Sequence, residues 1–328
     1  MYNSFDKIIV TININDVNYL NEDLFSKSIN KEGVVTFENY KDIGLGVSVN
    51  KINNNINIEL SSKILKSDYP KKISLLNIVN ILKKIKHIID IEPYKFMRSK
   101  PILCEITSDI YVENTSQTIK VLHSLAKVKT GYKTLPRVRK HGRKETSFYI
   151  KKDVATKYIS EYVSIYNKYN EFFESYKNEN NDLLDILTEK QIEKLKLHFE
   201  NIVRIETSYN SRQAIKYAFK FNSSFDLFDL MFSRININKI IFQKIYDDKS
   251  IKGLSSGVTY KQFDKYNTLY QYDFDLDRIY NEYRLRGGTG QKSKVLKPYK
   301  KILATIKASD KHVKIIENIK NKLQWKKV

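Results

Sequence analysis

Several features that define common protein classes are scarce or missing in this sequence of 328 residues. Cys104 is the only cysteine, which excludes an intrachain disulfide and a zinc site built on cysteines. The five histidines are scattered, and no HxH or HExxH pair occurs among them. No apolar run reaches the roughly 18 residues of a membrane span, and no basic segment followed by an apolar one opens the chain. We therefore expect an intracellular protein without membrane contact.

Positive charge is in large excess. The chain holds 58 Lys and Arg against 37 Asp and Glu, for a formal net charge of +21. A surplus of this size favours a polyanionic partner, because every phosphate that Lys or Arg neutralises releases condensed counterions. The alternative is compositional drift, since the sequence is also rich in Asn, Ile and Tyr and poor in Gly and Pro, as AT-rich genomes produce. Such drift should raise Asp and Glu as well, so we predict contact with a nucleic acid.

Hydrophobic patterning predicts mixed strands and helices in the first two thirds of the chain. Alternating apolar and polar residues predict strands at 6–17, 31–40, 43–52, 56–65, 102–113, 146–152 and 202–209. Apolar residues at every third or fourth position predict helices at 75–89, 116–128 and 188–201. Residues 154–176 are ambiguous, because tyrosines recur there at helical spacing while Val163 and Ile165 alternate as in a strand.

Beyond about residue 212 helical patterns replace the strand patterns, and the Gly- and Lys-rich segment 284–301 is predicted to be a mobile loop. The fold class that follows is α+β, with a central antiparallel sheet flanked by helices and a mainly helical C-terminal part. We expect two domains, one formed by residues 1–215 and a basic one formed by residues 216–328.

Glutamates interrupt three of the predicted strands. Glu59, Glu105 and Glu206 each stand between apolar neighbours, so each occupies the strand face opposite to those side chains. For any one of them, the solvent side of an antiparallel sheet is a sufficient explanation. Together with Glu171 they form the kind of oxygen-ligand set that binds Mg²⁺ or Mn²⁺. A divalent ion would also remove the repulsion between these carboxylates and the phosphates of DNA.

The segment SIYNKYNEF places a phenol, a cation and a carboxylate close together. Any single tyrosine among 23 is far more often part of a core or a surface than a nucleophile. A nucleophilic phenol, whose ordinary pKa is about 10, needs help from a cation or from a metal that polarises the phosphate. Lys168 supplies the cation for Tyr166, and Glu171 supplies a metal ligand. Tyr162 and Tyr169 stay open as alternatives, because one helical turn would separate Tyr162 from Tyr166.

Five segments follow one another in an order and at spacings that resemble a known family. They are INIELSSKIL, ILCEITSDIYVENTSQTIKVLHSL, KETSFYIKK, SIYNKYNEF and LHFENIVRIETSY. This set resembles the replication initiators of filamentous phages (the gene II type), which are related to the HUH endonucleases of rolling-circle replication. In that family the tyrosine of YxKxxE becomes joined to DNA, which implies Tyr166 here. The resemblance also matches Glu59, Glu105 and Glu206 to the family's strand acids.

Departures from the family bear on the metal site. Leu103 and Cys104 precede Glu105, where the phage protein has an arginine, and Tyr169 stands where some relatives have a histidine. HUH endonucleases bind their metal through two histidines, and this sequence has no such pair. The resemblance therefore implies an all-carboxylate site, or one that recruits His198.

Basic residues in segments 137–144 and 284–301, together with the arginine of the VRxE segment, are predicted to hold the phosphate backbone of DNA. A solvated surface is the alternative for either segment. The predicted DNA contacts are Arg137, Arg139, Lys140, Arg143, Lys144, Arg204, Arg284, Arg286, Lys292 and Lys294. The neighbouring aromatic residues Tyr132 and Tyr299 are expected to stack on unpaired bases.

The predicted function is initiation of rolling-circle DNA replication. It consists of metal-dependent nicking and rejoining of one strand of a phage or plasmid origin through a 5′-phosphotyrosine intermediate. The expected partners are single-stranded or supercoiled origin DNA and, in the cytoplasm of a bacterial host, the host helicase and polymerase. The alternative is a non-catalytic initiator of winged-helix type, which explains the charge but not the strand glutamates. An RNA-binding protein is a weaker alternative, because no RNP-type aromatic motif occurs.

Overall fold

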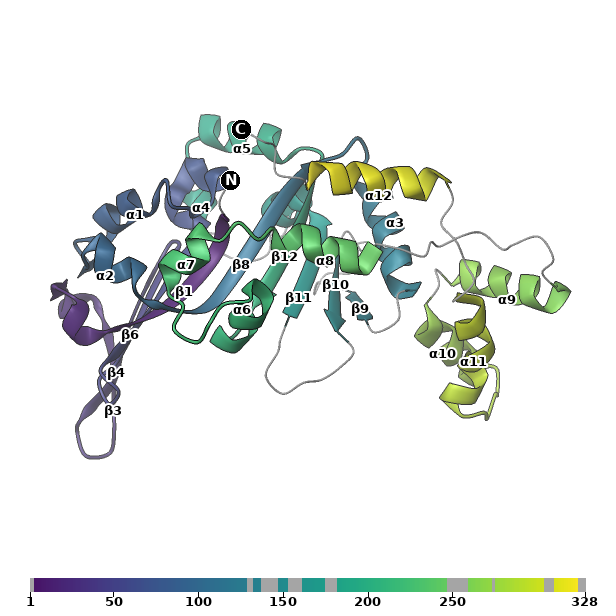
Figure 1. Cartoon of the computed structure of the whole chain (residues 1–328), viewed down its shortest axis with the longest axis horizontal. Helices are drawn as coiled ribbons and strands as arrows, with labels where there is room; N and C mark the ends of the chain where they lie inside the picture. Colours follow the sequence, from purple (N-terminus) through teal and green to yellow (C-terminus); the bar gives the residue numbers. More distant parts are fainter. Residues whose placement is uncertain are drawn as a thin grey trace.

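The computed structural model describes residues 3–128, 132–136, 147–152, 161–174, 182–246, 259–272, 275–303 and 310–323. Its centre is an antiparallel ten-stranded sheet in the order β3-β4-β5-β6-β1-β8-β12-β11-β10-β9 (Figure 1). The strands of this sheet are β1 (Phe5–Asn13), β3 (Ser26–Ile29), β4 (Val35–Asp42), β5 (Leu45–Asn50), β6 (Asn55–Ser61), β8 (Lys100–Tyr111), β9 (Tyr132–Pro136), β10 (Ser147–Lys152), β11 (Glu161–Asn167) and β12 (Ile202–Tyr209). A separate small sheet pairs β2 (Tyr19–Leu20) with β7 (Ile89–Asp90).

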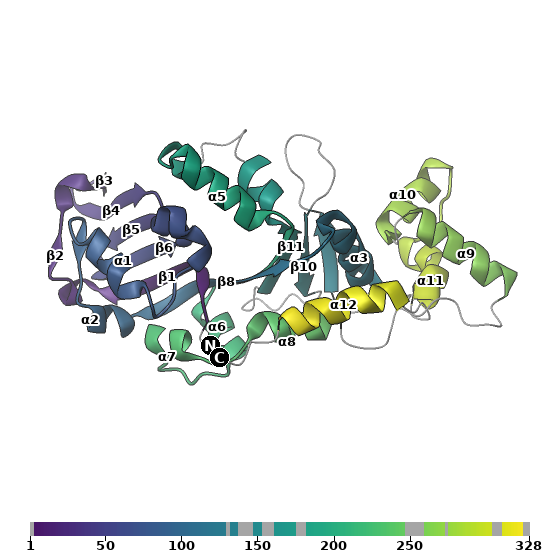
Figure 2. The same ribbon diagram turned by 90° about the horizontal axis from the view of Figure 1, so that it is seen from above.

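Helices flank the large sheet on both sides, so the predicted α+β class is confirmed. Figure 2 shows α6, α7, α8 and α12 on one side of the sheet and α5 on the other. The α-helices are α1 (Ile78–Ile85), α2 (Pro93–Met97), α3 (Thr115–Val128), α4 (Asp182–Asp185), α5 (Glu189–Phe199), α6 (Arg212–Phe219), α7 (Leu227–Phe232), α8 (Ile237–Tyr246), α9 (Tyr260–Gln271), α10 (Leu276–Leu285), α11 (Lys292–Leu303) and α12 (Asp310–Lys322). The 3₁₀ segments are η1 (Ile14–Asp16), η2 (Glu22–Leu24) and η3 (Ser62–Lys71), and η4 (Asn170–Glu174) is a π-helical turn. None of the helices described is long and apolar enough to cross a bilayer.

Strand alternation gives the sheet one apolar and one polar face. In β12, Val203, Ile205 and Tyr209 belong to the main hydrophobic core, which also contains residues of α6 and α8. The intervening residues Arg204 and Glu206 point to the opposite face, because successive side chains of a strand alternate. That second face is only partly covered, by η3, η4 and α5, and it carries the candidate site.

The hydrophobic core continues past residue 215. Phe219, Met231 and Phe242 belong to the same cluster as the sheet, and Ile319 of α12 joins it near the end of the chain. The helices α9, α10 and α11 have their own small cluster of buried residues. The hydrophobic core of the sheet therefore includes residues of the segment 216–328, which we expected to form a second domain.

One local prediction needs correction, and one open alternative is decided. The stretch 154–176, where the pattern left helix and strand open, contains a strand, β11, which gives way to η4 only after Asn167. The segment 284–301 is not a loop, because most of it is the helix α11 and only residues 286–291 are non-helical. Gly287, with φ of +82°, follows the end of α10, and the lysine-rich stretch after it buries Leu296. The predicted basic segment 137–144 lies outside the described residues.

Gly44, in the turn between β4 and β5, provides a test of this fold. Its φ is +75°, and an added Cβ would overlap the backbone of Ile64. We expect Gly44→Ala to lower the free energy of unfolding by at least about 2 kcal/mol, because left-handed strain and a backbone clash act together. Gly33→Ala is the matched control, since Gly33 has φ of +79° but nothing within 4 Å of an added Cβ. Urea unfolding of both variants separates the clash from the strain, and equal losses would contradict the packing of η3 on the turn.

Candidate active site

A β-bulge brings Asp6 onto the polar face of the sheet. In the pairing of β1 with β8, Phe5 opposes Ile106 and Lys7 opposes Glu105, which leaves Asp6 as the extra residue of β1. Phe5 is fully buried in the core, whereas Asp6 and Lys7 both line a hollow on the polar face. Strict alternation would have placed Asp6 and Lys7 on opposite faces. The bulge therefore adds a carboxylate to this face.

Glu105 of β8 and Glu206 of β12 lie beside Asp6. In the register of these neighbouring strands, Glu105 opposes Ser208 and Glu206 opposes Thr107, so the two glutamates are diagonal neighbours on one face. Each of the three acids offers a carboxylate oxygen, and these oxygens all lie within 4.8 Å of one another. Such a set of oxygen donors suits a hard divalent cation such as Mg²⁺ or Mn²⁺.

Crowding of these carboxylates changes their proton affinities. Burial, followed by the charges of Glu206 and Asp6, raises the pKa of Glu105 to about 7. Burial and the charge of Asp6 also raise the pKa of Glu206. Burial opposes ionisation of Asp6 as well, but Arg204 and Lys168 outweigh it and hold the pKa of Asp6 below its ordinary value. Two of the three acids therefore resist ionisation while no cation lies between them.

The phenol of Tyr166 is bonded directly to this group. Tyr166 lies on β11 opposite Arg204 of β12, and its Oη donates a hydrogen bond to Oε2 of Glu206 at 2.7 Å. The side chain is only 3% exposed, yet it lines the same hollow as the acids. Burial, followed by the charges of Glu206 and Glu171, raises the pKa of Tyr166 well above its ordinary value. The phenol therefore keeps its proton unless positive charge is added to the site.

A buried ionic layer lies beneath the carboxylates. Arg204, with no exposed surface, binds Asp109 through two hydrogen bonds of 2.6 and 2.8 Å and reaches Oδ2 of Asp6 at 3.3 Å. Lys72 contacts the same Asp109 at 3.3 Å. Asp6 also accepts hydrogen bonds from Ser62 and from Tyr69, the latter at 3.3 Å. These contacts fix the orientation of the Asp6 carboxylate, as hydrogen bonds from neighbouring residues do for the ligands of a metal ion.

Lys168 and Tyr69 extend this layer toward η4. Lys168 is 2% exposed and its Nζ contacts Oε2 of Glu171 and the Tyr69 hydroxyl, at 2.7 and 2.9 Å. Burial opposes the charge of Lys168, but Glu171 and the other acids outweigh it, and its pKa is raised. The lysine is thus a fixed cation 5.9 Å from the centre of the Tyr166 ring.

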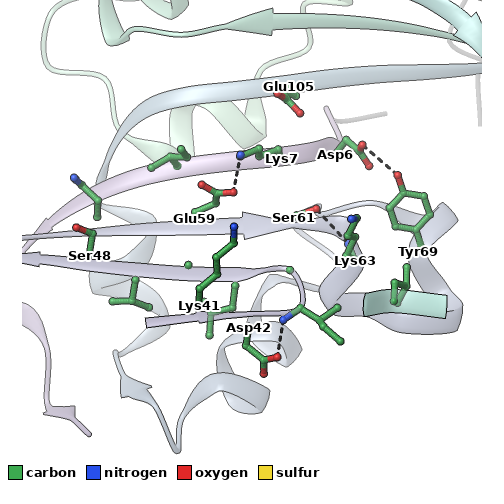
Figure 3. A pocket seen from close by; sticks show the side chains of 18 of the residues that line it. Asp6, Lys7, Lys41, Asp42, Ser48, Glu59, Ser61, Lys63, Tyr69 and Glu105 are labelled. Carbon is green, nitrogen blue, oxygen red and sulfur yellow. Dashed lines mark hydrogen bonds and ion pairs between the residues drawn. The ribbon is translucent and has the colours of Figure 1, made fainter. Parts of the chain in front are cut away.

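The hollow over these residues has a volume of about 970 Å³ and continues along β4, β5 and β6. In Figure 3, Lys7 reaches Glu59 and Tyr69 reaches Asp6, while Lys41 and Lys63 extend into the same space. Polar residues such as Asn39, Ser48 and Asn57 complete its wall. An anionic, extended ligand fits a hollow that has carboxylates at one end and lysines along its length, provided that a cation screens the carboxylates.

The charge balance of the site fits a divalent ion. The site and the ionic layer beneath it together contain eight charged groups. The five carboxylates are those of Asp6, Glu105, Glu206, Asp109 and Glu171, and the three cations are Arg204, Lys168 and Lys72. Glu59 and Lys7 form a separate pair, with Oε1 and Nζ 2.6 Å apart. If all five acids are ionised, these groups carry a net charge of −2, which a single Mg²⁺ or Mn²⁺ would neutralise.

The structure brings together part of the predicted site. Tyr166, Glu105 and Glu206, three of the predicted site residues, lie together, while Asp6 was missed because the bulge that turns it to this face was not predicted. Glu59 lines the hollow but pairs with Lys7, and Glu171 pairs with Lys168. Neither Glu59 nor Glu171 belongs to the close group of three acids found among the described residues.

Three other predicted residues lie apart from this group. Tyr162 and Tyr166 share a strand rather than a helix, so their Cα atoms are about 13 Å apart instead of one helical turn. Tyr169 packs on Phe173 and lines a different surface hollow. His198 on α5 keeps more than a third of its surface exposed, and partial burial of its ring, with the cations Lys72 and Arg204, lowers its pKa despite Asp109. The clustered donors are therefore carboxylates alone.

Arg204 was predicted to contact DNA, and this prediction is wrong, because the guanidinium is buried and bound to Asp109. Among the other predicted contacts, Arg286 pairs with Glu282 and Lys292 with Asp277 at the surface, and Arg284 donates to the carbonyl of Gly288. Lys294 is exposed. A DNA-binding role for these C-terminal residues, and stacking by Tyr299, stay predictions. Those at Arg137, Arg139, Lys140, Arg143 and Lys144 lie outside the described residues.

We expect Arg204→Met to lower the free energy of unfolding by about 3–5 kcal/mol, because it leaves buried Asp109 and Asp6 without their main cation. Arg286→Met is the matched control, since Arg286 is 75% exposed and its ion pair with Glu282 is screened by solvent, so its loss should leave the free energy of unfolding nearly unchanged. Urea unfolding measures both. Similar small losses in the two variants would show that the ionic layer does not support the fold.

Among known proteins, one solved structure shows a weak similarity to this chain. No family model matches the sequence, and no curated protein does. Among solved structures, the chain is similar to a rolling circle replication initiator protein from Geobacillus stearothermophilus, at 10% identity and a TM-score of 0.37. The match covers 79% of this chain and 89% of that chain. At this identity and TM-score the likeness assigns neither an activity nor any residue, so the functional proposal depends on the site itself.

Proposed function

We propose that this protein is a metal-dependent DNA-nicking endonuclease and strand transferase that initiates rolling-circle replication of a phage or plasmid. One observation carries the proposal: the phenol of Tyr166 is hydrogen-bonded to Glu206, which belongs to a group of three carboxylates lining a lysine-containing hollow. In this proposal Tyr166 is the nucleophile, the three carboxylates are the metal site, and the hollow holds the anionic strand.

The reaction is a transfer of one phosphodiester. The Tyr166 oxygen forms a bond to the scissile phosphorus, the bond from phosphorus to the 3′ oxygen breaks, and the product is a 5′-phosphotyrosine with a free 3′ hydroxyl. Glu206 accepts the hydrogen bond of the phenol and is placed to take its proton. The leaving 3′ oxygen takes up a proton from water.

Asp6, Glu105 and Glu206 would hold Mg²⁺ or Mn²⁺, which supplies a Lewis acid for the phosphate and positive charge beside the phenol. Lys168 adds a fixed positive charge near the Tyr166 ring. Rejoining is the reverse transfer, in which a 3′ hydroxyl attacks the phosphotyrosine. Recruitment of a host helicase and polymerase belongs to the same proposal, because the free 3′ hydroxyl starts replication only when a polymerase extends it.

A covalent-adduct assay tests the proposal. The purified protein is mixed with Mn²⁺ or Mg²⁺ and labelled single strands from its own replicon, then separated under denaturing conditions. A protein–DNA adduct that requires the metal and is lost in EDTA is the expected result. If no strand of the replicon gives an adduct although the strands bind, the protein is a non-catalytic initiator.

A further inference from the structure

A second hollow, of about 570 Å³, lies where β1 and β6 meet the start of β8, α2 and α6. Four cationic side chains line it, and Asp16 is the one acid among the residues that the structure assigns to its wall. The cations are Lys95, Arg98, Lys100 and Arg212. In the described part of the chain, neither Lys95 nor Lys100 takes part in an ion pair, so their charges are available to a ligand.

Two buried donors in this hollow have no hydrogen-bond partner. Ser99 is 4% exposed, and its Oγ is unsatisfied. Arg212 donates through Nη2 to the carbonyls of Ser223 and Phe225, and its guanidinium lies 3.9 Å from the centre of the Phe225 ring, but its buried Nη1 has no hydrogen-bond partner. Buried polar groups in native proteins are almost always hydrogen-bonded, so two unsatisfied donors on residues that line one hollow point to a missing acceptor. A phosphate oxygen accepts from both a hydroxyl and a guanidinium.

Tyr94 adds an aromatic surface beside these donors. Its ring is 69% exposed, and the Arg98 guanidinium lies 5.7 Å from the ring centre. Arg98 is paired with Asp226 at 2.9 Å but keeps 63% of its side chain exposed. Exposed rings next to cations bind single-stranded nucleic acids, because bases stack on the ring while phosphates meet the charge.

Ile102 connects this hollow to the candidate active site. The register of β1 with β8 shifts between Ile9 and Val10, which oppose Leu103 and Pro101, so Ile102 is the extra residue of a second bulge. Ile102 lines both hollows. The two hollows therefore adjoin at Ile102, so a DNA strand that lies over the carboxylates can continue into the basic hollow.

We infer that the hollow around Ser99 and Arg212 is a phosphate subsite for the DNA strand that continues beyond the scissile phosphate. The inference rests on the proposed nicking function for its ligand, a single DNA strand. In it, Ser99 and Arg212 donate to one phosphate, Lys95 and Lys100 neutralise its neighbours, and Tyr94 stacks on an adjacent base.

The test measures binding without cleavage. The probe is a fluorescent oligothymidylate of about 20 nucleotides, titrated in Mn²⁺ at several salt concentrations against proteins that all carry Tyr166→Phe, so that the carboxylates are screened and no strand is cleaved. We expect Lys95→Ala/Lys100→Ala to weaken binding about ten-fold and to reduce the salt dependence by about one to two phosphate contacts. The matched control is Lys244→Ala/Lys314→Ala, which removes the same charge from exposed positions that line neither hollow. Equal weakening in both double variants, or none in either, would overturn the inference.

Ser99→Ala gives a second readout that a role in folding alone would not move. Removing an orphan buried hydroxyl should leave the melting temperature unchanged or raise it, while binding of the oligothymidylate weakens several-fold. Unchanged binding in Ser99→Ala would mean that no phosphate uses this donor. The adduct assay separates the two proposals. If the wild-type protein binds the strand through these residues but forms no adduct, the phosphate subsite stands and the proposed nicking activity is wrong.

Discussion

Tyr166→Phe is expected to abolish the covalent protein–DNA adduct while strand binding and Mn²⁺ binding stay within about two-fold of the wild-type values. The substitution removes only the attacking oxygen, because the ring keeps its packing at a position that is 3% exposed. Glu206 loses the hydrogen bond from the phenol but keeps its place in the carboxylate group. The loss should therefore appear in adduct formation and cleavage alone.

Three other tyrosine variants serve as controls for this result. Tyr162→Phe and Tyr169→Phe should retain the adduct, since neither residue lines the hollow with the carboxylates. Tyr69→Phe is the sharpest control, because Tyr69 is also buried, lines that hollow and donates to Asp6. Burial and Asp6 raise the pKa of Tyr69 to about 12 despite Lys168 and Arg204, so it too keeps its proton. An adduct that survives in Tyr166→Phe and disappears in Tyr69→Phe would move the nucleophile to η3.

Strand alternation explains how Glu105, Glu206 and Tyr166 come together, although the sequence left the strand of Tyr166 undecided. Each lies on the polar face of its strand, and β8, β12 and β11 are adjacent in the sheet. Their side chains then meet without any special feature of the backbone. The same rule places Arg204 on this face, directly opposite Asp109 of β8. Arg204 is buried because it pairs with Asp109, and the net charge of the whole chain gives no indication of that pair.

The two β-bulges in the pairing of β1 with β8 were not predicted from the sequence. Asp6 reaches the site because β1 carries an extra residue opposite Ile106 and Glu105, and Ile102 marks a similar shift in β8. Both bulges leave a trace in the sequence, because the consecutive polar residues Asp6 and Lys7 break the alternation of β1, and Pro101 stands next to Ile102 inside a central strand. Neither trace indicates which side chain the bulge turns to the polar face. The segment 284–301 failed for another reason. Its glycines are confined to a short turn, and most of the rest belongs to the helix α11, which buries Leu296 and, just beyond the segment, Ile302 and Leu303.

The metal site predicts a dependence on pH that can be measured without DNA. The pKa of Glu105 is raised to about 7 in the folded protein, above its ordinary value of 4.5. The stability that its neutral form contributes is fully present below pH 4.5 and is lost as the pH rises through about 7. A divalent ion needs the ionised form, so metal affinity should change in the opposite direction. From pH 6 to pH 8 the ionised fraction of a group with this pKa rises about ten-fold, and Mn²⁺ should bind about ten-fold more tightly.

Glu105→Gln separates these opposing effects. Without metal we expect the variant to melt at a higher temperature than the wild type at pH 8, because a buried carboxylate crowded by Glu206 and Asp6 becomes neutral. With Mn²⁺ the order should reverse, because the wild type gains ligand-binding energy that the variant largely loses. Cleavage by the variant should fall by at least about a hundred-fold while strand binding is kept.

Glu59→Gln is the matched control for the metal site, since Glu59 lines the same hollow but is paired with Lys7 at 2.6 Å. It should keep both the Mn²⁺-dependent rise in melting temperature and its pH dependence, as measured by differential scanning fluorimetry at pH 6 and pH 8. A loss in Glu59→Gln equal to that in Glu105→Gln would move the ion along the hollow, toward β6. A stabilisation by Mn²⁺ that survives in Glu105→Gln with its pH dependence intact would show that Glu105 is not a ligand, because no proton on that residue would then compete with the metal.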